Sequence, residues 1–174
     1  GVIIPKKGLM EIKRSLETCG ASCELAVAPP HVFLRTGEIA ITVKLIEAEF
    51  PPYEQVIPSQ SACSALLDRE RLLDALKRAQ IMSSETRGVR LSFSKKCTQI
   101  ASDNPELGEV NEEIESTYTG EDLSIGFNPK YFAEVLQHID TEQVRIELSG
   151  QLDPAVIRPH DSNGYVGVVM PMRI

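Results

Sequence analysis

The chain has 174 residues, enough to bury the core of one or two domains. With 42% hydrophobic and 25% charged residues its composition is that of an ordinary globular protein, and no apolar run approaches the ~20 residues of a membrane helix. The formal net charge of −7 excludes a protein that grips nucleic acid by bulk electrostatic attraction.

Three amphipathic segments of about three turns recur along the chain, at residues 5–16, 68–79 and 128–139. Their spacing is roughly sixty residues, and each is followed by short segments with the alternation of strands. The sequence therefore predicts three copies of one unit, a helix packed on antiparallel strands, and the fold class α+β.

The predicted helices each have one apolar face. In the second helix this face holds Leu72, Leu73, Leu76 and Ala79, with Arg71 and Arg78 on the opposite side. In the third it holds Tyr131, Phe132, Val135, Leu136 and Ile139, with Lys130, Ala133 and Gln137 outside. The first helix is expected to bury Leu9, Ile12 and Leu16. Asp68 and Asn128 are good N-caps, and Pro129 suits a first turn.

Strands are predicted between the helices. They cover residues 24–28, 31–35 and 38–45 after the first helix, 89–94, 98–102, 110–118 and 122–126 after the second, and 144–148, 155–158 and 165–171 after the third. Residues 50–58 contain three prolines and are interpreted as a linker.

Charge is segregated along the chain. Residues 103–122 hold eight carboxylates and no basic residue, whereas the first two helices carry Lys6, Lys7, Lys13, Arg14, Arg69, Arg71, Lys77 and Arg78. An acidic protein can therefore still present a locally positive surface.

No catalytic or metal site is predicted. The three histidines, His31, His138 and His160, lie in different units without a nucleophile motif, P-loop or dinucleotide fingerprint. The acidic run lacks the spacing of a calcium loop. Cys19 and Cys23 have no further Cys or His nearby that could complete a metal site, so ordinary reduced thiols are favoured over a metal or redox role. A thiol enzyme that uses Cys19 and Cys23 is a further alternative and is also disfavoured.

Several stretches resemble the bacterial sliding clamp, the beta subunit of DNA polymerase III. They are VIIPKKG (2–8), FPPY (50–53), VIP (56–58), RGVRL (87–91), NPELGE (104–109), IGFN (125–128) and VVMPMRI (168–174). The resemblance runs in order from end to end, and its most specific piece is the Met-Pro-Met-Arg ending at residues 170–173.

The resemblance implies the DNA-clamp fold, in which each of three domains holds two of the repeated units. Residues 1–53 would be the second half of the middle domain, 54–60 a linker, and 61–174 the C-terminal domain, giving one and a half clamp domains. Because the chain starts at Gly1 without a Met, it is expected to be processed or a fragment that lacks the upstream half.

The resemblance also implies a function. A sliding clamp is a homodimeric ring around duplex DNA, bound without sequence specificity, that tethers polymerases, the clamp loader and repair proteins through short linear motifs. It is a cytoplasmic processivity factor and an accessory subunit of a DNA-directed DNA polymerase, with no catalysis of its own, no cofactor and no membrane partner. The alternative is a stand-alone peptide-binding or assembly module without a DNA role, which would bind its partners normally as this chain alone.

Three sets of site residues follow from the resemblance. A peptide pocket is implied at Pro51, Gln55, Val56, Asn128, Tyr131, Pro154, Val168, Val169, Met170, Pro171, Met172 and Arg173, where Gln55 departs from the Arg often found there. DNA-facing helices carry Lys6, Lys7, Lys13, Arg14, Arg71, Lys77 and Arg78. A dimer interface is implied at Ile81, Met82, Glu106, Glu109, Glu112 and Glu113.

Overall fold

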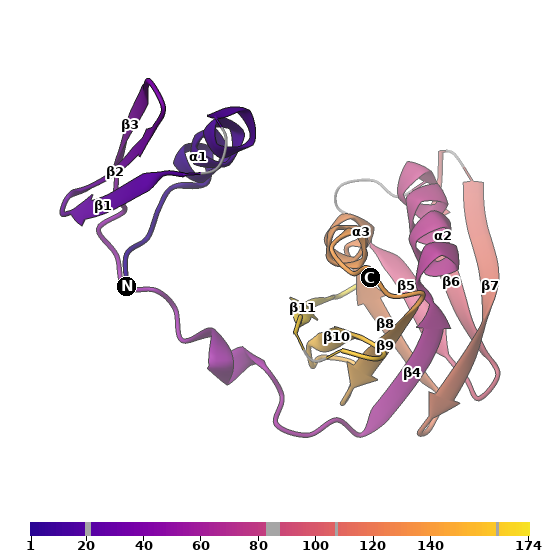
Figure 1. Ribbon diagram of the computed structural model, residues 1–174. Helices are drawn as coiled ribbons and strands as arrows, with labels where there is room; N and C mark the ends of the chain where they lie inside the picture. The colour runs from indigo at the N-terminus through magenta and orange to yellow at the C-terminus, as the bar shows by residue number, and fades with distance from the viewer. Residues whose placement is uncertain (20–21, 83–87, 107, 163) are drawn as a thin grey trace. The chain divides into compact units, whose positions relative to one another are not determined.

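The computed structural model of the protein describes residues 1–19, 22–82, 88–106, 108–162 and 164–174, with the side chain of Cys19 left out. The chain divides into two compact units, Gly1–Pro52 and Tyr53–Ile174 (Figure 1). Each unit has its own helix and sheet arrangement, and each is described by itself.

The first unit is one helix on a three-stranded antiparallel sheet. Its elements are α1 (Lys6–Cys19), β1 (Glu24–Ala28), β2 (His31–Thr36) and β3 (Ile39–Lys44), with the strands in the order β1-β2-β3. Ile12 of α1 and Val32 and Leu34 of β2 are buried. A Cβ at Gly8 would collide with Val43, so the glycine lets the first turn of α1 lie close against β3.

The prediction for the buried face of α1 was only partly right. Ile12 is buried, but Leu9 is 53% exposed and Leu16 is 38% exposed. The sheet beneath α1 has only three strands and α1 packs on β2 and β3. So narrow a sheet buries only the side of α1 that carries Ile12, and Leu9 and Leu16 remain partly in contact with water.

The described residues of the second unit form two α-helices and a nine-stranded antiparallel sheet. After the 3₁₀ turn η1 (Tyr53–Val56) come β4 (Cys63–Asp68), α2 (Arg69–Met82), β5 (Val89–Phe93), β6 (Cys97–Asn104) and β7 (Gly108–Thr119). Then follow β8 (Leu123–Phe127), α3 (Pro129–Gln137), β9 (Gln143–Leu148), β10 (Ala155–Pro159), β11 (Gly167–Val169) and β12 (Pro171–Met172). The strand order is β11-β10-β9-β4-β7-β6-β5-β8-β12.

This unit consists of two repeats that exchange their opening strands. β4 leads directly into α2, and β8 into α3. β4 pairs with β9 of the later repeat, whereas β8 pairs with β5 of the earlier one. The predicted caps are confirmed: Asp68 Oδ1 accepts the N–H of Arg71 at 2.8 Å, and Asn128 Oδ1 accepts that of Lys130 at 3.0 Å.

The core lies between the helices and one face of this sheet. Leu72, Leu73, Leu76 and Ala79 of α2 are buried as predicted, and α2 packs against α3. In α3 the predicted stripe is slightly rotated. Tyr131 is 58% exposed, and Ala133, expected to face outward, is buried. The reason is that α3 lies beside α2 as well as on the sheet, so the flank with Ala133 is covered and the flank with Tyr131 is not.

The two edge strands of the sheet are consecutive in sequence. β11 pairs with β10, and β12 pairs with β8 at the other end of the strand order. The single strand predicted at 165–171 is therefore two short ones, interrupted at Met170. The last residues thus connect both edges of the sheet.

Candidate functional site

The C-terminal segment gives the predicted peptide pocket its clearest support. Val168 is half-buried on β11, Met170 is 60% exposed between the edge strands, and Met172 is half-buried on β12. Val169 differs, because strand alternation turns it into the core, where it is 3% exposed. The structure therefore removes the Val169 side chain from the exposed surface.

A cavity of about 280 Å³ lies beside this segment. Its lining residues are Arg90, Ser124, Ile125, Gly126, Gln151, Leu152, Met172, Arg173 and Ile174. Of the residues predicted for the pocket, Met172 and Arg173 line it. Sequence reasoning missed Leu152, whose side chain is 68% exposed. An apolar residue in an otherwise polar turn, two positions before Pro154, could have indicated that Leu152 belongs to a binding surface.

The other predicted pocket residues are spread over several elements. Asn128 caps α3, Tyr131 is exposed on its first turn, and Pro154 is half-buried before β10. Gln55 and Val56 are exposed in η1, and Pro51 is exposed in the first unit. None of these lines the cavity at Met172.

The predicted DNA-facing cations are exposed, but several are already paired. Lys13 Nζ lies 3.9 Å from Glu17 Oε1 on α1, and Lys77 Nζ lies 3.5 Å from Asp74 Oδ1 on α2. Lys6, Lys7, Arg14 and Arg71 are exposed and pair with no carboxylate in the described ranges.

Arg78 forms a two-point ion pair with Glu112 of β7. Its Nε and Nη2 donate to the two carboxylate oxygens at 2.7 and 2.6 Å. The hydrogen bond from Arg78 lowers the pKa of Glu112 below its ordinary value, and the same bond raises the pKa of Arg78. A residue predicted to face DNA and one predicted to face a second subunit are therefore bonded to each other.

The predicted dimer residues at the end of α2 form one corner of the unit. Ile81 is 75% exposed. Asn104 joins this helix end to the β6–β7 turn: its Nδ2 donates to the Met82 carbonyl at 3.0 Å, and its Oδ1 accepts the N–H of Glu106 at 3.0 Å. Sequence reasoning missed Asn104, although an Asn-Pro pair is a common turn signal.

The acidic residues of β7 do not form one edge. Glu109 and Glu113 are exposed, whereas Glu112 alternates with them and lies on the helix side, with Ile114. The four predicted glutamates thus divide into an exposed set, Glu106, Glu109 and Glu113, and the paired Glu112.

β7 is paired on one side only through most of its length. Gly108 to Glu115 pair with β6, while Ser116 to Thr119 pair with β4 on the other side. Among the described strands, the β4-side edge of the first half of β7 has no partner. This open edge starts at the corner with Ile81 and Glu106.

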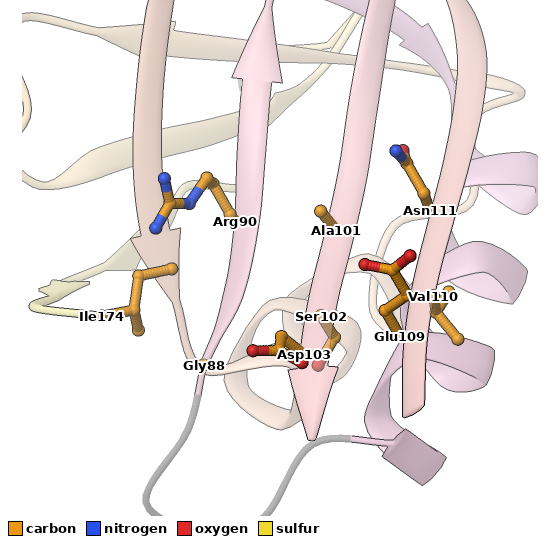
Figure 2. A pocket seen from close by; sticks show the side chains of 9 residues that line it. All are labelled: Gly88, Arg90, Ala101, Ser102, Asp103, Glu109, Val110, Asn111 and Ile174. Carbon is orange, nitrogen blue, oxygen red and sulfur yellow. The ribbon is translucent and has the colours of Figure 1, made fainter. Parts of the chain in front are cut away.

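A larger cavity of about 530 Å³ lies on the sheet face that turns away from the helices. Figure 2 shows Asp103 and Glu109 on neighbouring strands, with Asp103 between Glu109 on the right and Arg90 and Ile174 on the left. Asp103 and Glu109 are directly opposite in register, and like charges in such a pair repel. Ala101 and Gly88 also line this cavity.

The remaining polar groups form no catalytic constellation among the described residues. Cys23, Cys63 and Cys97 are free thiols, and the Cys19 side chain lies outside the described residues. No group of three or more His, Cys, Asp or Glu in the described ranges could hold a metal ion. His160 Nδ1 is 3.3 Å from Arg145 Nη2, and His138 Nδ1 is 2.7 Å from the Glu134 carbonyl oxygen. Within the described chain no helix is long and apolar enough to cross a membrane.

Two family models match the chain. Residues 54–173 match the C-terminal domain of the DNA polymerase III beta subunit, and residues 1–52 match its central domain. Among curated proteins, the beta sliding clamps of Pseudomonas aeruginosa and Escherichia coli K12 are 38% and 33% identical to it. Each comparison covers 99% of this chain and 47% or 48% of the relative, so the chain spans about half the length of these relatives.

Solved structures give the same result. A DNA polymerase III beta subunit from Pseudomonas aeruginosa matches with a TM-score of 0.92 at 39% identity, over 99% of this chain and 48% of the other. A sliding clamp from Bartonella birtlesii bound to griselimycin matches with a TM-score of 0.93 at 28% identity, over 100% and 47%. The repeated helix-and-sheet units are thus those of a clamp, and the chain belongs to the DNA polymerase III beta subunit family of sliding clamps.

Proposed function

We propose that this chain is part of a processivity clamp that holds replication and repair enzymes on duplex DNA. The observation that carries the proposal is the match to clamp structures over 99% of the chain, at a TM-score of 0.92. In such a clamp the ring restrains the DNA topologically, so its DNA contacts can be weak. The chain acts in the cytoplasm and has no catalysis of its own.

The two family matches support the proposed domain division. We propose residues 1–53 as half of a middle domain, 54–60 as a linker and 61–174 as the C-terminal domain; the central-domain match covers residues 1–52, and the C-terminal-domain match covers 54–173 and includes the proposed linker. The C-terminal domain contains both exchanged repeats, whereas the first unit has a single helix and three strands.

The proposed ring joint is the corner at the end of α2. The open edge of β7 can accept a strand from a partner, because unpaired N–H and C=O groups form a template for sheet extension. Ile81 offers an exposed apolar side chain beside this edge. Glu106, Glu109 and Glu113 would face basic side chains of the partner, which aids encounter and fixes register. Met82 supports Ile81, and Glu112 supports the joint from the helix side through Arg78.

The proposed peptide pocket is built around the C-terminal segment. Tyr131, Leu152, Met170 and Met172 supply exposed or half-exposed apolar side chains, and methionines adapt to several ligands. Arg173 can bind a backbone carbonyl or carboxylate. Gln55, Val56, Asn128, Pro154, Val168 and Pro171 complete the proposed wall within the second unit. A clamp with bound griselimycin shows that at least one relative takes a ligand.

A fluorescent peptide with Gln followed by Leu and Phe tests the pocket by anisotropy. We expect weak binding to the chain, and Met172→Ala or Val168→Asp to weaken it at least about fivefold, or ~1 kcal/mol. Met10→Ala is the matched control, since Met10 is 56% exposed but lies in the first unit. Equal affinity of all three variants and the unaltered chain would refute the pocket.

A further inference from the structure

The unpaired positive charge of α2 lies at its N-terminal end. Lys77 is paired with Asp74 and Arg78 with Glu112. Arg71, in the first turn, is exposed and pairs with no carboxylate in the described parts of the chain. The helix macrodipole adds positive potential at this end. Arg71 is therefore the α2 cation most available to an anion.

A cavity of about 550 Å³ brings Arg71 together with two lysines from a distant part of the sequence. Lys95 and Lys96 form the turn between β5 and β6 and are exposed. The Lys96 carbonyl accepts the N–H of Ser116 at 3.0 Å, which fixes this turn against β7. The remaining polar wall is Ser116, Thr117 and Gln143.

Two carboxylates also line the cavity, Asp68 and Glu115. Asp68 is engaged in capping α2 through the N–H of Arg71. Glu115 is exposed, and no cation among the described residues pairs with it. Three cations thus face two carboxylates, one of which is occupied by the backbone, and the balance favours an anion.

We propose that this cavity binds a backbone phosphate of duplex DNA, with Lys95 and Lys96 as contact residues beside Arg71. The inference rests on the proposed clamp function and extends its DNA surface beyond the helices. Flexible lysines on a turn act as point charges and read no base edges. Such contacts hold the duplex without sequence preference, as a sliding protein requires.

The test measures anisotropy of a fluorescein-labelled duplex against the full chain over a series of salt concentrations. Each phosphate contact contributes about 0.9 to the slope of log affinity against log salt. The double variant Lys95→Ala/Lys96→Ala, which removes the contact to one phosphate, should therefore lower the slope by about 0.9. Glu115→Gln should act in the opposite direction and tighten binding. Lys44→Ala, which removes an exposed lysine from β3, is the control expected to change nothing.

The matched double variant Lys6→Ala/Lys7→Ala separates this inference from the proposed function. A slope that falls for Lys6/Lys7 but stays unchanged for Lys95/Lys96 overturns the inference and leaves the clamp function standing. Absence of duplex binding by the unaltered chain at the lowest salt overturns the DNA role of the chain and this site with it. A fall confined to Lys95/Lys96 supports the site and contradicts the assignment to α1.

Discussion

Arg78 and Glu112 are bonded through both guanidinium donors and both carboxylate oxygens, at 2.7 and 2.6 Å. The pair ties the second half of α2 to β7, across 34 positions of sequence. Because such a fork-to-fork pair fixes orientation as well as distance, it holds the helix end carrying Ile81 in register with the open edge of β7.

This pair predicts a specific dependence of stability on pH. The pKa of Glu112 is lowered in the folded protein, so its stabilising contribution is complete above the unfolded pKa of about 4.3 and is lost as pH falls through the folded value. Glu112→Gln should therefore flatten the acid limb of the stability curve, measured by urea unfolding from neutral pH to about pH 3. Glu113→Gln is the control on the opposite face, and an equal effect there would contradict the assignment.

Burial predicts a contrast between two leucines. Leu76 of α2 is fully buried, whereas Leu9 of α1 is 53% exposed. Leu76→Ala should cost ~2–5 kcal/mol in the unfolding of the second unit, through lost transfer energy and the cavity left behind. Leu9→Ala should cost less than about 1 kcal/mol, because most of that side chain already contacts water. Chemical denaturation of both variants checks this, and similar losses would contradict the arrangement of the first unit.

Asn104 predicts that the corner at the end of α2 depends on one side chain. Asn104→Ala removes the bonds to the Met82 carbonyl and the Glu106 N–H and should cost ~1–3 kcal/mol. Hydrogen exchange should rise in the last turn of α2 and the β6–β7 turn. Asn111→Ala, which changes an exposed side chain on β7, should leave both unchanged. If the two variants behave alike, Asn104 does not hold the corner.

Gly126 predicts how tightly the C-terminal strand is held. A Cβ at this position would lie 2.6 Å from the Met172 carbonyl oxygen and 2.7 Å from a side-chain carbon of Ile174. Gly126→Ala should therefore displace β12, cost ~1–3 kcal/mol by overpacking, and make the tail sensitive to limited proteolysis. Gly164→Ala is the control, because its Cβ would be 3.5 Å from Ser162 Oγ, an ordinary van der Waals contact. An intact β12 and unchanged stability in the Gly126 variant would contradict the prediction that this contact is too tight for a Cβ.

Periodic elements could be predicted from the sequence, and non-periodic ones could not. The face of α2 follows from its leucine spacing, and the alternation of β5 and β9 is visible in the sequence. β4 was missed because Cys63–Asp68 contains no β-branched or aromatic residue, and its place in the sheet comes from partners on β7 and β9. The exposure of Tyr131 and the burial of Ala133 were not predicted, because they depend on the packing of α3 against α2. The sequence of α3 alone does not contain that information.

The candidate sites show the same division. The apolar C-terminal segment and the basic helices can be recognised from the sequence. Which of the basic side chains are free to bind an anion depends on ion pairs between elements that are distant in the sequence. Arg78 is not available to bind an anion because it is paired with Glu112. Lys95 and Lys96 line the same cavity as Arg71 because the β5–β6 turn lies against β7. No local pattern contains those distances.

The exchange of opening strands has a consequence for the order of events during synthesis. β4 is synthesised before β9, one of its two partners, which follows about eighty residues later, as the pair Cys63–Leu148 shows. The last strands then join both ends of the sheet. Contacts between such distant segments form slowly, so β8 and β10 lack their outer partners in a growing chain until β11 and β12 have been made. The segment that pairs last is also the one proposed to bind partner peptides, so we expect the proposed pocket to form only after the rest of the second unit.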